Sequence, residues 1–216
     1  PEGGKMLSST LEHPASMSAM KKWAKNTQRN HIIIEHDNDS GSVDEQAYIK
    51  KLTNDVRIVY IVHTSPVTGM TVDLEKITQE VRNVTPDCII IVDGIQHSSH
   101  GAIDVQRYDI DGYVVSPYKM FSRHGYGVAW ASERLCSLNK EQLADGPFQN
   151  WELGTRDAGS YATFSDVVDY LDWLGSNFTE SENTRERLEA SSIAIKSHEQ
   201  ELVDLVINGA EDIVGL

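Results

Sequence analysis

The chain has 216 residues, of which 39% are hydrophobic and 24% are charged, and its formal net charge is −14. A chain of this length and composition can bury a core, which excludes a disordered or fibrous protein. The acidic charge argues against a nucleic-acid or anionic-membrane surface, because both need clustered lysine and arginine. No apolar run is long enough to span a bilayer, and the two cysteines lack a CxxC spacing, so we expect a cytoplasmic protein.

The apolar periodicity of the first half predicts alternating helices and strands. We expect a helix over residues 15–26 and a short buried strand over 31–35. Turn residues predict a loop at 37–41, before a short helix over 45–52. The remaining elements of this half are a β-branched strand over 56–62, an amphipathic helix over 72–81 and a buried strand over 88–92.

The second half contains two further predicted strands, over residues 112–115 and 127–130. Helices are expected over 164–174 and from about 184 to 208. Strands and helices that alternate in this way are typical of βαβ units. The fold class is therefore α/β, with a largely parallel sheet.

Polar residues stand directly after three of the predicted strands, where ligands bind in open α/β sheets. Asp93 ends an apolar strand, and a buried carboxylate there needs a cation or strong donors to compensate it. Lys119 follows another strand, and a lysine in a partly dry pocket is nucleophilic toward carbonyl groups. The two residues together predict a cofactor with a cationic ring nitrogen and an aldehyde, and pyridoxal 5′-phosphate (PLP) has both.

Five sequence motifs carry a resemblance to a known family. They are Leu-Glu-His-Pro-Ala at residues 11–15, Ile-Val-Asp-Gly-Ile-Gln at 91–96, His-Gly-Ala-Ile-Asp-Val-Gln at 100–106, Ser-Pro-Tyr-Lys at 116–119 and Trp-Glu-Leu-Gly-Thr at 151–155. Their order and spacing resemble the PLP-binding core of class V aminotransferases and cysteine desulfurases. The Tyr118-Lys119 pair resembles a cysteine desulfurase-like subgroup, which has Tyr-Lys at the position where many relatives have His-Lys.

The resemblance implies roles for four residues around the cofactor ring. Lys119 would form the Schiff base with PLP and then transfer protons to and from the substrate. Asp93 would pair with the pyridinium nitrogen, and Gln96 would hydrogen-bond the ring hydroxyl. His13 would stack on the ring and take part in acid–base steps. Lys119 and His13 are therefore the catalytic candidates.

The resemblance also implies how the phosphate of the cofactor would be held. Ser116 and Tyr118 would bind it from the same chain. Thr155 would reach it from the second subunit of a homodimer with shared active sites. The substrate of such an enzyme would be an amino acid.

The domain organisation follows from the same resemblance. Its members are fold type I PLP enzymes, in which a three-layer α/β/α large domain with a mainly parallel mixed sheet precedes a small C-terminal domain. Turn residues near Gly175 place the boundary, so that residues 1–175 would be a partial large domain and 176–216 a long helix leading into the small domain. We expect the N-terminal phosphate loop and most of the small domain to be missing, which would leave the chain inactive by itself.

The sequence leaves the reaction open. Pro66 stands where desulfurases have an Asn near the substrate, and neither Cys88 nor Cys136 occupies the place of the persulfide-forming cysteine. Cleavage of cysteine or selenocysteine, transamination, racemisation and β-elimination are all candidate reactions of a PLP-dependent lyase or transferase. The alternative is a catalytically incomplete scaffold or partner-binding protein that keeps the fold.

Single residues also have simpler interpretations. Lys119 alone would fit a surface lysine, and His13 a residue that flanks a helix. His97, His100 and His124 do not predict a metal site, because they lack the i, i+4 spacing of helical zinc ligands and have no thiolate nearby.

Overall fold

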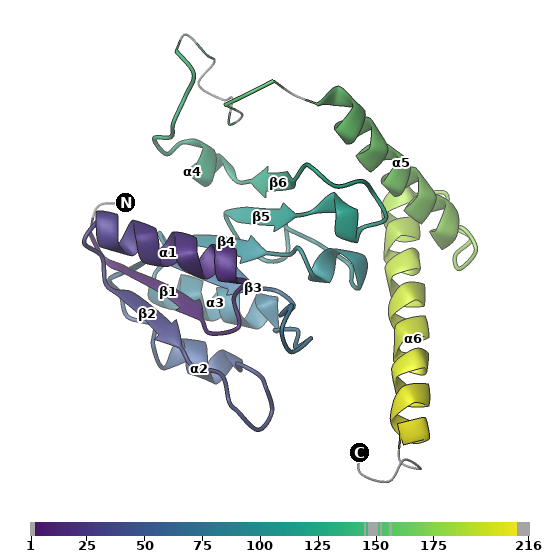
Figure 1. Cartoon of the computed structure of the whole chain (residues 1–216), viewed down its shortest axis with the longest axis horizontal. Helices are drawn as coiled ribbons and strands as arrows, with labels where there is room; N and C mark the ends of the chain where they lie inside the picture. Colours follow the sequence, from purple (N-terminus) through teal and green to yellow (C-terminus); the bar gives the residue numbers. More distant parts are fainter. Residues whose placement is uncertain (1–2, 145, 147–150, 152, 156, 211–216) are drawn as a thin grey trace. The chain divides into compact units, whose positions relative to one another are not determined.

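The computed structural model of the chain describes residues 3–144, 146, 151, 153–155 and 157–210 (Figure 1). The described residues form two compact units. The sheet unit comprises those within 1–97, 104–116 and 127–156. The helical unit comprises those within 98–103, 117–126 and 157–216.

A six-stranded sheet forms the centre of the sheet unit. Its strands are β1 (Lys5–Ser9), β2 (His31–Ile34), β3 (Val56–Val62), β4 (Ile89–Asp93), β5 (Gly112–Val115) and β6 (Val128–Ala131). They are arranged in the order β2-β1-β3-β4-β5-β6. Every neighbouring pair is parallel except β5 and β6. The predicted α/β class with a mainly parallel mixed sheet is therefore confirmed.

Helices cover both faces of this sheet. They are α1 (Pro14–Asn26), α2 (Glu45–Ile49), α3 (Leu74–Val84) and the short α4 (Glu133–Cys136). The β1-α1-β2 connection runs toward one edge of the sheet, whereas β2-α2-β3 and β3-α3-β4 run toward the other. Because such crossovers are right-handed, α1 lies on one face and α2 and α3 lie on the opposite face (Figure 1). Met20 and Ala24 of α1 pack on Met6 of β1 in the core.

The change of direction after β2 creates a topological switch point between β1 and β3. At this point the chain leaves β1 toward one face and leaves β3 toward the other. The loops after these two strands diverge, and the crevice between them at the carboxyl ends of the strands is where open α/β sheets bind ligands. The fold therefore singles out the loops that follow β1, β3 and β4.

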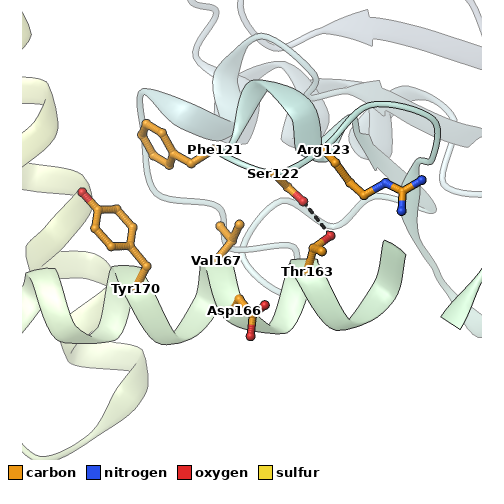
Figure 2. A pocket seen from close by; sticks show the side chains of 7 residues that line it. All are labelled: Phe121, Ser122, Arg123, Thr163, Asp166, Val167 and Tyr170. Carbon is orange, nitrogen blue, oxygen red and sulfur yellow. Dashed lines mark hydrogen bonds between the residues drawn. The ribbon is translucent and has the colours of Figure 1, made fainter. Parts of the chain in front are cut away.

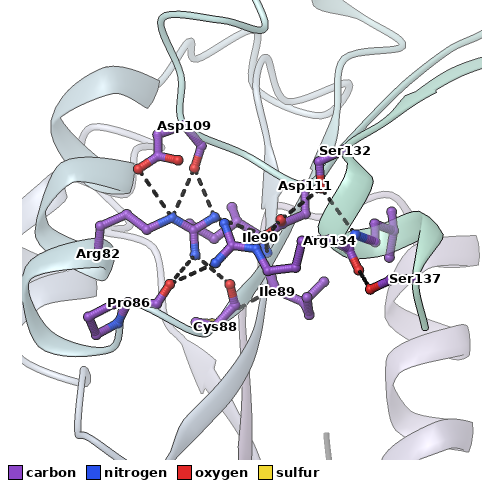
Figure 3. A network of polar contacts seen from close by, with 11 residues as sticks. Arg82, Pro86, Cys88, Ile89, Ile90, Asp109, Asp111, Ser132, Arg134 and Ser137 are labelled. Carbon is purple, nitrogen blue, oxygen red and sulfur yellow. Dashed lines mark hydrogen bonds and ion pairs between the residues drawn. The ribbon is translucent and has the colours of Figure 1, made fainter.

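A buried aspartate ties several elements together at the opposite, amino-terminal edge of the sheet (Figure 3). Asp111 is fully buried, and its carboxylate accepts hydrogen bonds from Arg82 Nη2 at 2.9 Å, Arg134 Nε at 2.8 Å, Ser132 Oγ at 3.0 Å and the Ile90 N–H at 2.9 Å. Burial by itself raises the pKa of Asp111, but the bonds from Ile90, Arg82 and Ser132 outweigh burial and hold the pKa below its usual range. This network fixes α3, β4, β5 and α4 to one another.

The helical unit contains the 3₁₀ turn η2 (Pro117–Lys119) and two long helices, α5 (Ala158–Gly175) and α6 (Thr184–Ala210). The helices pack closely where α5 ends, and Gly175 permits this approach because a Cβ atom there would collide with the backbone of Arg187. Arg187 also pairs with Asp172 at 3.3 Å. None of the helices in the described part of the chain is long and apolar enough to cross a membrane.

Most predicted elements are present, with shifted ends. The predicted helix over 72–81 is α3, which begins at Leu74 and continues to Val84. The helix predicted from residue 164 begins six residues earlier, at Ala158, where Asp157 caps it. Strand β1 and helix α4 were not predicted from the sequence. The division expected near residue 175 stays a prediction.

Candidate functional site

Asp93 is the last residue of β4, and its side chain is 3% exposed. The Ile95 N–H donates to Oδ1 at 3.0 Å, whereas Oδ2 faces, within the described part of the chain, the hydroxyl groups of Ser16 and Tyr60, both at 3.4 Å. No lysine or arginine of the described residues forms an ion pair with this carboxylate. A buried carboxyl group with one well-bonded and one weakly bonded oxygen is suited to pair with a cationic group of a ligand.

The chain must turn tightly after Asp93, and Gly94 permits this turn. A Cβ atom at this position would collide with the ring of Tyr113 on β5. Gln96 follows and is half-buried. The sequence therefore places a buried carboxylate and an amide side chain within one short loop at the carboxyl edge of the sheet.

His13 lies at the same edge, at the start of α1. Its Nδ1 accepts the N–H of Ala15 at 3.1 Å, so His13 caps the helix while its ring stays exposed. Ser16, in the next turn, reaches Asp93. The structure thus brings the N-terminus of α1 to the Asp93 carboxylate and confirms that His13 flanks a helix. The stacking role of His13 stays a prediction.

Glu12, beside His13, is a buried acid that received no role from the sequence. Its side chain is in the loop between β1 and α1, and the residue is 4% exposed. Oε1 accepts the Ser9 hydroxyl at 2.8 Å and the Ser9 N–H at 3.2 Å, whereas Oε2 is buried and has no hydrogen-bond partner among the residues that the structure describes. Burial, with a smaller contribution from the nearby Asp93 charge, raises the pKa of Glu12 to about 7 despite the opposing hydrogen bonds from Ser9 and the Val62 backbone.

Two stacked histidines, His63 and His97, belong to the segments that follow β3 and β4. The rings of His63 and His97 stack with centroids 3.5 Å apart, and His63 Nδ1 lies 2.9 Å from the Tyr113 hydroxyl. His97 Nδ1 lies 3.0 Å from Thr64 Oγ1. Burial, with a smaller contribution from the neighbouring His97, lowers the pKa of His63 to about 3. No sequence signal predicts this pairing, because the two histidines follow different strands, β3 and β4.

Pro66 lies in an exposed loop that begins beside the switch point. The ends of this loop are joined by a β-bridge between Thr64 and Thr71. Ser65 Oγ donates to the Leu11 carbonyl at 3.3 Å, which connects the loop after β3 with the loop after β1. The substrate-loop position predicted for Pro66 therefore lies at the carboxyl edge of the sheet.

The other predicted site residues lie in different places. Ser116 directly follows β5 in the sheet unit and is half-buried, and Thr155 is exposed. Lys119 and Tyr118 belong to the helical unit, where Lys119 is half-buried at the end of η2. The Tyr118 ring stacks on His124 with centroids 4.1 Å apart. Glu152, from the same motif as Thr155, lies outside the described residues.

The segment after Lys119 is anchored on α5 (Figure 2). Ser122 Oγ lies 3.0 Å from Thr163 Oγ1, and Arg123 pairs with Asp157 at 3.4 Å. Phe121 has a left-handed backbone, with φ of +68°. A non-glycine residue in this region is strained, and such strain often accompanies functional loops. The lysine is thus followed by a loop that a hydrogen bond and an ion pair connect to α5 and its N-cap.

The described residues contain no group of three or more histidine, cysteine, aspartate or glutamate side chains that could hold a metal ion. The polar groups at the carboxyl edge are instead the carboxyl groups of Asp93 and Glu12, hydroxyl groups and imidazole rings. Such a set can hold an organic ligand with a cationic group by hydrogen bonds and charge.

Comparison with known proteins identifies the family of the chain. The family model Aminotransferase class-V matches residues 1–203. A probable cysteine desulfurase of Mycoplasma genitalium is 29% identical over 129 residues, which are 60% of this chain and 31% of that protein. The aminotransferase-like protein FGM3 of Gibberella zeae is 26% identical over 208 residues, covering 93% of this chain and 48% of that protein.

Solved structures show the same fold. The apo cysteine desulfurase of Thermococcus onnurineus superposes with a TM-score of 0.76 at 20% identity, covering 98% of this chain and 52% of that one. The cysteine desulfurase CsdA of Escherichia coli gives a TM-score of 0.68 at 22% identity, with 85% and 47% covered. The chain thus spans from about a third to half of the length of these proteins. Because the family model matches residues 1–203, the chain belongs to the class-V aminotransferase family.

Proposed function

We propose that the chain is the cofactor-binding part of a PLP-dependent enzyme that acts on an amino acid. The observation that carries this proposal is the Asp93 carboxylate, which is buried, has one weakly bonded oxygen and lacks a cationic partner among the described residues. A protonated pyridine nitrogen would supply the missing charge. Membership of the class-V aminotransferase family and the names of the relatives support the same cofactor.

The residues present fit this group. Asp93 would pair with the ring nitrogen and Gln96 would bind the ring hydroxyl. Ser116 and Tyr118 would hold the phosphate, and Thr155 would reach the phosphate bound by a second copy in a homodimer. A cytoplasmic location belongs to the same proposal.

Two side chains would handle protons. PLP, when bound, withdraws electrons from the Cα atom of an amino acid and so weakens the bonds of that atom. Lys119 Nζ would hold the aldehyde carbon of the cofactor through a C=N bond formed with loss of water, and once the amino group of the substrate had displaced it, the freed amine would accept or deliver a proton at Cα. His13 Nδ1 is already an acceptor of the Ala15 N–H, so the ring proton of neutral His13 lies on Nε2, on its exposed side.

Replacement of Lys119 tests the proposal. PLP added to the longest available form of the protein should give a visible absorption band, and Lys119→Ala should lose this band. Lys22→Ala, an exposed lysine of α1, should keep it. A band that is unchanged in Lys119→Ala would contradict the assignment of this lysine.

The reaction is decided by titrating amino acids into the coloured protein. Sulfide and alanine from L-cysteine would identify a desulfurase, and selenide from selenocysteine the corresponding lyase. A new keto acid would identify an aminotransferase. Colour that responds to no amino acid would favour the non-catalytic scaffold, for which the exposed Pro66 in the substrate loop is the specific argument.

A further inference from the structure

Glu12 is a buried carboxyl group that the proposed function does not use. The hydroxyl and the N–H of Ser9 both donate to Oε1, and the backbone of Val62 also acts on the carboxyl group, while Oε2 is shielded from water and has no hydrogen-bond partner among the described residues. An ionised carboxylate spreads its charge over both oxygens. Ionisation of Glu12 would therefore leave an uncompensated charge away from water, at a cost that a protonated carboxyl avoids.

The groups that face Glu12 are themselves acids. They are Tyr48 of α2, Tyr60 of β3 and Asp93 at the end of β4. The phenol of Tyr48 is fully buried against Ser9, and Tyr60 points its hydroxyl at Asp93. Among the described residues, no lysine, arginine or histidine acts on Glu12. Two acids in such surroundings hold one negative charge between them more readily than two.

We propose that Glu12 is a positioning residue, held as the uncharged acid, which leaves Asp93 as the single anion at the switch point. The geometry decides which of the two keeps the proton. Asp93 receives a backbone N–H and faces two hydroxyl groups, whereas Glu12 has an oxygen without any donor. As a link to the cofactor this rests on the proposed function: a cation that pairs with Asp93 would make Glu12 release its proton more easily.

The protonation of Glu12 is testable without any cofactor. Glu12→Gln mimics the neutral acid, and Glu35→Gln, an exposed glutamate after β2, is the matched control. Urea denaturation measures the free energy of unfolding of Glu12→Gln and of wild type. The difference between them should shift in favour of Glu12→Gln as the pH rises from about 4.5 to about 7, and it should stay constant above pH 7. Glu35→Gln should show no such trend. Curves for wild type and Glu12→Gln that stay parallel over this range would overturn the proposal.

The coupling to Asp93 has its own test. In an Asp93→Asn background the repulsion from Asp93 is gone, so the pH range of the Glu12-dependent change should move to lower values. Infrared spectroscopy at neutral pH should also show the band of a protonated carboxyl that Glu12→Gln removes. This second measurement decides the question if denaturation of a variant is not reversible, and absence of the band in wild type would refute the proposal.

The link to the cofactor is measured by calorimetry of PLP binding in two buffers of different ionisation enthalpy. Wild type should release more protons at pH 7 than Glu12→Gln, because only wild type has a proton to lose at this position. Equal proton release by the two proteins would show that PLP binding does not change the protonation of Glu12, and it would overturn the proposed link to the cofactor. If wild type binds no PLP, the proposed function fails, and the cofactor-free denaturation experiment still decides the protonation of Glu12.

Discussion

Single residues at the carboxyl edge of the sheet are chosen for space as much as for charge. Gly94 stands between Asp93 and the loop that carries Gln96, and the Tyr113 ring occupies the position that a side chain would need. The Tyr113 hydroxyl in turn contacts His63. One missing Cβ atom thus allows an aromatic ring to pack under the Asp93 loop and to order the histidine pair.

A methyl group at this position should disturb the whole arrangement. Gly94→Ala forces Tyr113 to move, and overpacking of this kind destabilises proteins by about 1–3 kcal/mol. Urea denaturation measures the loss. Gly154→Ala is the matched control, because a Cβ atom there meets nothing within 4 Å. Equal stability of the two variants would show that Tyr113 does not pack as described.

At the scale of elements, apolar strands were predicted well and polar ones were not. β4 follows the apolar run 88–92 almost residue for residue. β1 has the sequence Lys-Met-Leu-Ser-Ser, which is short and neither alternating nor continuously apolar. It is a strand because β2 and β3 pair with it on both sides. Tertiary pairing overrides a weak local signal in this case.

The elements at the amino-terminal edge depend on Asp111. Asp111→Asn should destabilise the protein by about 3 kcal/mol, since it removes the buried anion that pairs with both Arg82 and Arg134 and leaves Arg82 with only the weaker, exposed ion pair to Asp109. Denaturation midpoints measure the change. Asp109→Asn, an exposed neighbour that also pairs with Arg82, should cost less than about 1 kcal/mol. Equal effects would mean that burial of Asp111 does not matter.

At the scale of the whole molecule, buried titratable groups set the dependence of stability on pH. The folded state binds fewer protons at His63 than the unfolded chain does between pH 3 and 6.5. Stability from this residue therefore rises with pH over that range and is lost as the solution is acidified. Glu12 acts in the opposite direction between about pH 4.5 and 7, by about 3 kcal/mol.

Removal of the histidine should flatten the acid side of the stability profile. His63→Gln should lose less stability than wild type on going from pH 6.5 to pH 4, by an amount on the order of 3 kcal/mol. Denaturation at a series of pH values gives the comparison. His198→Gln, at an exposed position of α6, should lose as much stability as wild type over this pH range. The same loss in His63→Gln would show that His63 is not buried in its neutral form.

The sequence by itself determined the α/β class, most helices and strands, and the polar residues that follow the strands. These follow from local properties, namely apolar periodicity, turn residues and motif spacing. Asp93 was identified because a carboxylate after an apolar strand is unusual at any position in a chain.

Only the tertiary structure decided the strand order and, with it, the switch point between β1 and β3. It also decided that Ser16 and Tyr60 face Asp93, that His63 stacks on His97, and that one oxygen of Glu12 has no partner. The physical reason is that burial and pairing depend on residues far apart in the chain. Glu12 and Asp93 are 81 positions apart in the sequence, and their shared electrostatics exists only once the sheet has formed.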